Sequence, residues 1–318
     1  MLTGLRTLTF EHNRLQGTIP TEIGLLTGLT RLNLYDNDFT GTVATEIGLL
    51  TSLTFLSLGG NYLSDTIPTE IRLLTGLTSL NLFGNMLTDT IPTEIGLLTG
   101  LNSLGLSSNQ LIGSIPTEIV MLTGLTTLHF DNNKLTGTIP TEVGLLISLT
   151  RLDLDGNHLS GTIPVEVGLL TGILWLSMCK NQLKGSLPTE VGLLTSLVNL
   201  NLGNNRFNGS ILSEIGFLAR LTRLYLGSNE FIGSIRTEIG MLTSLQSLGL
   251  DNNKFTGSIP SEIGLLTDLD GVSFYDNELT GSIPRSWCGQ RNIFAAIDCD
   301  KIKCSCCQGD GQYYCPRN

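Results

Sequence analysis

The chain has 318 residues, of which 41% are hydrophobic, and a formal net charge of −10 at pH 7. It carries 28 acidic and 18 basic residues, and eleven of the acidic ones are a single glutamate that recurs from Glu22 and Glu46 to Glu262. Binding to nucleic acid requires clustered lysine and arginine, which the scattered basic residues do not provide. No run of about 18 apolar residues occurs either, so we expect no membrane-spanning helix.

The amino terminus begins inside a repeated pattern. The first residues, "MLTGLRTLTF", already follow the repeat described below, and no segment covers the apolar side of this first repeat. Terminal repeats of a stacked array need a polar outer face. We therefore expect the chain to be truncated at its amino end, without a signal peptide and without an amino-terminal cap.

An asparagine recurs every 24 residues, twelve times without slippage. These residues are Asn13, Asn37, Asn61, Asn85, Asn109, Asn133, Asn157, Asn181, Asn205, Asn229, Asn253 and Asn277. A fixed internal period indicates a solenoid rather than separate globular cores. A buried asparagine in each repeat needs backbone groups of neighbouring turns as partners, so we predict a structural ladder and not a catalytic set.

Each repeat predicts the same two elements. Before the asparagine, the pattern "LxxLxL" predicts a short strand, as at Leu29, Leu32 and Leu34. Successive strands should form a parallel sheet at about 4.8 Å per repeat. After the asparagine, a glycine, or Asp65 and Asp89, lets the chain turn. Proline then prevents a regular helix, and the recurring glutamate opens a short helical turn.

This repeat resembles the plant-type, extracellular leucine-rich repeat. The resemblance lies in "LTxLxLxxNxLTGTIPTEIGLLTGL", in which "GxIP" after the asparagine marks the type, and it covers about residues 2 to 287. It implies an α/β solenoid of about twelve repeats, a curved right-handed horseshoe whose concave parallel sheet binds proteins, peptides or carbohydrates. Neither a kinase domain nor an inserted island between repeats is present, so functions that depend on them are not expected.

Equivalent positions of successive repeats form columns, and a binding surface must lie in the columns that vary. On the strand face these are the positions six, four, two and one residues before the asparagine and one residue after it. Repeats two to four place there the predicted ligand-binding residues Tyr35, Phe55, Tyr62, Phe83 and Met86. Tyr35 and Phe83 share a column with Gly59 between them, about 9.6 Å apart across two strand spacings. We predict an aromatic hot spot with room for a flat ring, and scattered surface aromatics are the alternative.

Repeats six to eight hold a second, mostly ionisable cluster. Its predicted ligand-binding members are Asp131, Arg151, Asp153, Asp155, His158 and Trp175. Asp131 and Asp155 should lie about one strand spacing apart, and this like-charge pair is destabilising unless a cation neutralises it. Lys134 and Arg151 can neutralise it within a solvated network, or a basic group of a ligand can dock there. A metal ion fits this mixture of imidazole and carboxylates poorly.

Cys179 together with His158 or His129 superficially suggests a thiol nucleophile and its base. The sequence supplies neither an enclosed pocket nor a set of oxyanion donors. A lone cysteine in a strand usually behaves as a small hydrophobe. We therefore predict no catalytic residue, no metal and no cofactor.

The residue five after each ladder asparagine is serine or threonine in all twelve repeats. This column comprises Thr18, Thr42, Thr66, Thr90, Ser114, Thr138, Thr162, Ser186, Ser210, Ser234, Ser258 and Ser282. Regular hydroxyl rows can match ordered water, which makes ice binding conceivable. A polar strand on the flank of the solenoid explains the same column through β-propensity and hydroxyl pairing.

Six of the seven cysteines fall in the last 31 residues. They are the disulfide candidates Cys288, Cys299, Cys304, Cys306, Cys307 and Cys315. Such density predicts a disulfide-stapled cap, residues 288–318, after a solenoid of residues 1–287, in an oxidising compartment. A zinc knuckle on "CSCC" is the alternative, although the tail lacks a histidine. The stretch "IDCDKIKCSCC" resembles the cysteine-rich ends of secreted diatom leucine-rich-repeat proteins.

These observations predict a non-catalytic recognition module, extracellular or at the cell surface. It would be receptor-like or inhibitor-like, bind a protein or peptide on its concave face, and serve signalling or defence. The alternatives are binding of a cell-wall polysaccharide, and a structural or ice-binding solenoid that uses its hydroxyl rows.

Overall fold

The computed structural model describes residues 4–289, 293–303 and 313–314. The chain divides into two compact units, Met1–Leu159 and Ser160–Asn318, and each has the same internal plan. Among the described residues, no helix has the length and apolar character needed to cross a bilayer.

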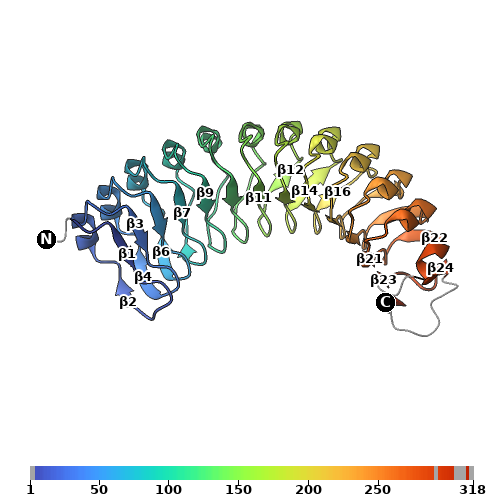
Figure 1. Cartoon of the computed structure of the whole chain (residues 1–318), viewed down its shortest axis with the longest axis horizontal. Helices are drawn as coiled ribbons and strands as arrows, with labels where there is room; N and C mark the ends of the chain where they lie inside the picture. Colours follow the sequence, from blue (N-terminus) through green and yellow to red (C-terminus); the bar gives the residue numbers. More distant parts are fainter. Residues whose placement is uncertain (1–3, 290–292, 304–312, 315–318) are drawn as a thin grey trace. The chain divides into compact units, whose positions relative to one another are not determined.

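In the first unit, each repeat contributes one short strand to a parallel sheet (Figure 1). Paired residues are one 24-residue period apart, as Leu8 is opposite Leu32, because equivalent leucines of successive repeats stack over one another. The predicted parallel-sheet solenoid is confirmed. The strands in order are β1 (Thr7–Thr9), β3 (Arg31–Asn33), β5 (Phe55–Ser57), β7 (Ser79–Asn81), β9 (Ser103–Gly105), β10 (Thr127–His129) and β11 (Arg151–Asp153).

A second sheet runs along the flank of the first unit. Its strands are β2 (Gln16–Thr18), β4 (Asp38–Thr42), β6 (Tyr62–Asp65) and β8 (Met86–Leu87). The predicted polar flank strand therefore exists. Its register is shorter than the period: Thr18 is opposite Thr40 rather than Thr42. The predicted hydroxyl column thus pairs with a neighbouring column and not with its own copies.

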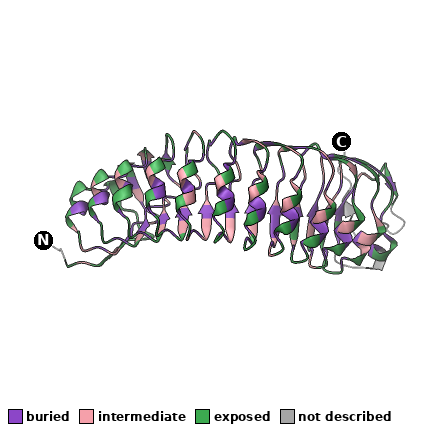
Figure 2. Ribbon diagram, turned by 90° about the horizontal axis from the view of Figure 1, so that it is seen from above, coloured by how far each residue is buried: buried purple, intermediate pink, exposed green. Residues whose placement is uncertain are grey.

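On the side opposite the sheet, the described part of the first unit has six five-residue 3-10 helices, each with both buried and exposed residues (Figure 2). Proline sets the entry, since Pro68 is extended at φ −68°, ψ 139°. Glycine lets successive helices approach, because a Cβ on Gly48 would lie 2.8 Å from the carbonyl oxygen of Glu70. The helices are η1 (Thr21–Leu25), η2 (Thr45–Leu49), η3 (Thr69–Leu73), η4 (Thr93–Leu97), η5 (Thr117–Met121) and η6 (Thr141–Leu145).

The predicted asparagine ladder is confirmed. The Asn61 side chain donates from Nδ2 to the carbonyl oxygens of Leu34 (3.0 Å), Leu58 (3.0 Å) and Gly59 (3.1 Å). Its Oδ1 accepts from the backbone N–H of Phe39 at 3.1 Å. Asn61 is buried, so one side chain satisfies backbone groups of two repeats that water does not reach.

The residue before each ladder asparagine has a left-handed backbone in all twelve repeats, with φ between 51° and 64°. This column comprises His12, Asp36, Gly60, Gly84, Ser108, Asn132, Gly156, Lys180, Asn204, Ser228, Asn252 and Asp276. Glycine, asparagine and aspartate tolerate this conformation best. The backbone therefore restricts a column that the sequence analysis treated as free for a ligand.

The second unit repeats the plan. Its main parallel sheet contains β13 (Trp175–Ser177), β15 (Asn199–Asn201), β17 (Arg223–Tyr225), β19 (Ser247–Gly249), β21 (Gly271–Ser273), β23 (Phe294–Ala296) and β25 (Tyr313–Tyr314). Its flank strands are β12 (Ser160–Gly161), β14 (Gln182–Gly185) and β16 (Arg206–Phe207), and separately β18 (Ile232–Ser234), β20 (Lys254–Ser258), β22 (Glu278–Ser282) and β24 (Ile302–Lys303). Its 3-10 helices are η7 (Val165–Leu169), η8 (Thr189–Leu193), η9 (Ser213–Phe217), η10 (Thr237–Met241), η11 (Ser261–Leu265) and η12 (Arg285–Gly289).

Residues after the last repeat extend the main sheet and the second flank sheet of this unit, because β23 pairs with β21 and β24 with β22. The carboxylate of Asp298 accepts from the backbone N–H groups of Asp276 (2.9 Å) and Asn277 (3.3 Å). Within the repeats, the next turn's carbonyl oxygens accept these bonds, so Asp298 takes their place at the end of the ladder. Lys301 Nζ donates to the carbonyl oxygen of Asn277 at 2.9 Å and holds the segment in position.

Two of the six predicted disulfide candidates lie within the described part of the chain. Cys299 is disulfide-bonded, and Cys288 belongs to η12. The other four, Cys304, Cys306, Cys307 and Cys315, lie outside the described residues. The stapled cap of residues 288–318 therefore stays a prediction.

Candidate functional site

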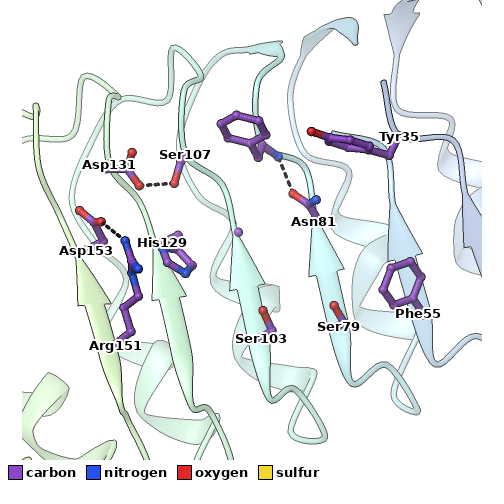
Figure 3. Close-up of a pocket in the computed structure, with 12 residues that line it drawn as sticks. Tyr35, Phe55, Ser79, Asn81, Ser103, Ser107, His129, Asp131, Arg151 and Asp153 are labelled. Atoms are coloured by element: carbon purple, nitrogen blue, oxygen red, sulfur yellow. Dashed lines mark hydrogen bonds and ion pairs between the residues drawn. The ribbon is translucent and has the colours of Figure 1, made fainter. Parts of the chain in front are cut away.

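The sheet face of the first unit contains a hollow of about 490 Å³. Its lining residues are Tyr35, Phe55, Ser79, Asn81, Phe83, Ser103, Gly105, Ser107, His129, Asp131, Arg151 and Asp153 (Figure 3). Six of the eleven residues that the sequence analysis selected are among them. The hollow has an aromatic end, a floor of small side chains and an ionisable end.

Tyr35, Phe55 and Phe83 form the aromatic end. Phe55 belongs to β5, whereas Tyr35 and Phe83 each follow a strand by two residues. The guanidinium carbon of Arg31 lies 3.6 Å from the centroid of the Phe55 ring, a cation–π contact that holds the ring in place. Phe83 remains 39% exposed, which is enough for a ligand side chain to pack on it.

The predicted open slot between Tyr35 and Phe83 is partly filled. A Cβ built on Gly60 would lie 3.5 Å from Cε2 of Tyr35, so the tyrosine ring lies against Gly60 of the next repeat. Figure 3 shows this ring extended along the sheet. Together the three rings give the aromatic end of the hollow an apolar lining on which a flat group can lie.

The floor of the hollow consists of Ser79, Ser103, Gly105 and Ser107, and the sequence analysis did not select these residues. Asn81 lies beside them, and its Oδ1 accepts from the backbone N–H of Phe83 at 3.0 Å. The sequence did contain a signal for them, a run of small residues in the variable strand-face columns of repeats four and five. Small side chains leave the hollow its depth and let a ligand main chain approach the sheet.

The ionisable end is formed by His129 on β10, Asp131 two residues after β10, and Arg151 and Asp153 on β11 (Figure 3). Arg151 donates to Oδ2 of Asp153 at 3.2 Å. Asp131 accepts from the hydroxyl of Ser107 and from Nδ2 of Asn132. Lys134 was predicted to neutralise these carboxylates. Its Nζ instead donates to Oε1 of Gln110 at 3.1 Å.

Asp153 carries a perturbed carboxyl group. Burial, together with the neighbouring carboxylates of Asp155 and Asp131, raises its pKa to about 6, although the hydrogen bond from Arg151 acts in the opposite direction. Burial also lowers the pKa of His129, with Arg151 acting in the same direction. At neutral pH the ionisable end therefore combines a neutral imidazole with carboxylates that repel one another.

The charge on Asp153 should destabilise the fold above its folded pKa. A raised folded pKa means that its contribution to stability is complete below the unfolded value of 3.8 and is lost as pH rises through about 6. We expect Asp153→Asn to raise the free energy of unfolding by about 2 kcal/mol at about pH 8 and to change little at about pH 4. Urea denaturation at both pH values measures this. Equal stability of the two proteins at the higher pH would contradict it.

A metal ion is the other candidate occupant of this end. His129, Asp131 and Asp153 each offer one ligand atom, and these atoms lie within 4.8 Å of one another. However, Asp153 is already paired with Arg151 at 3.2 Å, and an imidazole mixed with carboxylates matches the preferred ligands of no single ion. The donor set therefore fits a metal ion poorly.

The other predicted residues lie apart from the hollow. Tyr62 and Met86 begin the flank strands β6 and β8, where they are 52% and 41% exposed. They are therefore on the flank and not on the strand face where the sequence analysis placed them. Asp155 is half-buried behind Asp153, to which its N–H donates at 3.4 Å, and His158 is exposed. Trp175 belongs to β13 of the second unit.

The second unit has a hollow of its own, which the sequence analysis did not predict. It measures about 440 Å³, and its lining includes Tyr225, Gly249, Gly271, Tyr275 and Phe294. The sequence could have indicated it, because Tyr225 and Tyr275 occupy variable strand-face columns in which nearby repeats have glycine. Unlike the hollow of the first unit, it combines its aromatic rings with few charged groups.

Two family models match the chain. One, described as "Leucine rich repeat", matches residues 99–159. The other, described as "Leucine Rich Repeat", matches residues 4–26, 52–74, 76–98, 196–218 and 244–266. Together they cover more than half of the chain. A search of curated protein sequences returns no significant match.

Several solved structures are similar to this one. The LRR ectodomain of the plant membrane receptor kinase GASSHO1/SCHENGEN3 from Arabidopsis thaliana, in complex with CASPARIAN STRIP INTEGRITY FACTOR 2, is 36% identical with a TM-score of 0.83, covering 92% of this chain and 39% of that chain. The plant peptide hormone receptor RGFR1 in complex with RGF2 is 34% identical with a TM-score of 0.88, covering 96% and 52% respectively. A plant ice-binding protein is 27% identical with a TM-score of 0.61, covering 80% and 74%.

The present chain therefore spans between two-fifths and about half of the two receptor chains. The likeness extends over almost all of its own length and agrees with the period, the asparagine ladder and the "GxIP" segment. This chain belongs to the leucine-rich-repeat family, with repeats of the plant type.

Proposed function

We propose that this protein is a non-catalytic recognition module that binds a peptide in the hollow of its first unit. The observation that carries the proposal is the hollow itself, in which aromatic and ionisable side chains meet in columns that the fold leaves free. Asp153 supports it, because a buried carboxylate that costs stability is typical of a binding site. The similarity to RGFR1, a plant peptide hormone receptor, supports it as well.

An extracellular or cell-surface location accompanies this proposal, and so does a role in signalling or defence. A cysteine-rich cap over residues 288–318, like the ends of secreted diatom leucine-rich-repeat proteins, suits an oxidising compartment. Binding of a cell-wall polysaccharide finds no support among the similar structures.

The test is capture of peptides from the low-molecular-weight fraction of extracellular fluid, with the oxidised chain as bait and mass spectrometry as readout. We expect Phe83→Ala to reduce capture about tenfold, because exposed aromatic anchors dominate such interfaces. The matched control is Phe217→Ala, which removes a ring that is 59% exposed on the outer helix η9 and should leave capture unchanged. Capture of no peptide, or equal capture by all three baits, would refute the proposal.

Ice binding remains a second candidate, because a plant ice-binding protein has a similar structure. The serine and threonine column is also exposed in every repeat except at Ser210, which is half-buried. An assay of ice recrystallisation separates the two candidates. If the hydroxyl rows act on ice, replacing Thr42, Thr66 and Thr90 with tyrosine abolishes the activity, whereas Phe83→Ala leaves it intact.

A further inference from the structure

Local charge in the first unit's hollow is unbalanced at one end. The carboxylates of Asp131 and Asp153 line it and that of Asp155 acts on Asp153 from outside the lining, whereas Arg151 is the one guanidinium among the lining residues. His129 adds no compensating charge at neutral pH, because burial lowers its pKa. A cationic group from a ligand would relieve this repulsion, and an acidic or phosphorylated ligand would increase it.

Asp131 is held where such a group would meet it. Its carboxylate accepts from the hydroxyl of Ser107 and from Nδ2 of Asn132. These two bonds restrain the carboxylate at the border between the floor and the ionisable end, and Asp131 is half-buried. A carboxylate held in advance loses less side-chain entropy when it binds a cation than a freely rotating one.

The two ends lie at a definite spacing. The aromatic end centres on Phe55 of β5, between Tyr35 after β3 and Phe83 after β7, and Asp131 follows β10, three strand steps from β5. At about 4.8 Å per step this distance is about 14 Å. An extended peptide that crosses the strands advances about 3.4 Å per residue, so four residues cover this distance.

The two-residue period of side-chain direction in an extended chain agrees with a separation of four residues. Residues separated by an even number of positions point to the same face, so the first and fifth residues of such a segment both face the sheet. Ser103 and Gly105 lie between the two ends and leave room for the peptide main chain. An odd spacing would direct one of the two side chains away from the hollow.

We infer that the hollow selects an extended peptide that bears an aromatic side chain and, four residues away, a lysine or arginine side chain. The ring lies on the aromatic end formed by Tyr35, Phe55 and Phe83, and the cation lies against Asp131. This inference rests on the proposed peptide-binding function. It adds the composition and the spacing of the ligand.

The test uses a phage-displayed library of random twelve-residue peptides selected on the full, oxidised chain. We expect the enriched peptides to share an aromatic and a basic residue four positions apart. The best of them is then synthesised with its basic residue as arginine, as citrulline, which keeps the shape and removes the charge, and as arginine moved by one position. Titration calorimetry should show about tenfold weaker binding for the two altered peptides.

Protein variants make the assignment specific. Asp131→Asn should weaken the arginine peptide about tenfold and leave the citrulline peptide nearly unchanged, since the coupling needs both charges. The control is Asp38→Asn, which changes a half-buried aspartate on flank strand β4 and should have no effect on either peptide.

The outcomes separate the two levels of the proposal. Enriched peptides that lose affinity with Phe83→Ala but carry no basic residue, or that ignore Asp131→Asn, overturn this inference and leave the proposed function standing. A library that yields no peptide dependent on Phe83 overturns both.

Discussion

Replacing Asn109 with alanine is expected to lower the free energy of unfolding by about 3–5 kcal/mol, because it leaves several buried backbone groups without partners. The side chain of Asn109 donates to the carbonyl oxygens of Leu82 (3.0 Å), Leu106 (3.0 Å) and Ser107 (3.2 Å). Its Oδ1 accepts from the N–H of Leu87 at 3.0 Å. Alanine removes all four bonds at a site that water does not reach.

Urea denaturation of the variant measures this loss. The matched control is Asn102→Ala, since Asn102 is exposed and makes a single side-chain bond, from Nδ2 to the carbonyl oxygen of Gly124 at 3.1 Å. It should cost less than about 1 kcal/mol, because water replaces the lost partner. Equal losses for the two variants would show that the ladder does not stabilise the repeat stack.

Phe231→Ala should destabilise the second unit by about 3–5 kcal/mol, because it opens a cavity in the middle of a buried stack. The rings of Phe207 and Phe231 lie 6.2 Å apart, and those of Phe231 and Phe255 lie 6.1 Å apart with planes within 6° of parallel. All three side chains are fully buried. The central ring therefore loses contacts on both sides when it is truncated.

Thermal and urea unfolding followed by circular dichroism provide the measurement. Phe231→Leu refills most of the volume and should recover more than half of the loss. Phe217→Ala, on the outer side of η9, should stay within about 0.5 kcal/mol of the parent chain. If Phe231→Ala costs no more than Phe217→Ala, the stack does not contribute to stability.

The architecture could be predicted from the sequence because the period repeats every backbone environment twelve times. A leucine at each inward position and an asparagine every 24 residues admit one solution, in which equivalent residues stack and Asn61 and its copies bridge neighbouring turns. The aromatic and ionisable clusters were also visible, since aromatic residues such as Phe83 and charged residues such as Asp153 gather in the variable columns of neighbouring repeats. Their position on a common strand face follows from strand alternation alone.

Other features depended on neighbours in space that the period does not encode. The Tyr35 ring lies against Gly60 of the next repeat, and Lys134 bonds to Gln110, because a side chain takes whichever partner its rotamers can reach. Tyr62 lies on the flank because backbone pairing with Thr40 starts β6 at that residue. The sequence by itself thus determined the solenoid, its ladder and the two clusters. Only the tertiary structure decided which residues join in one hollow, because side-chain direction and flank register are set by contacts between repeats.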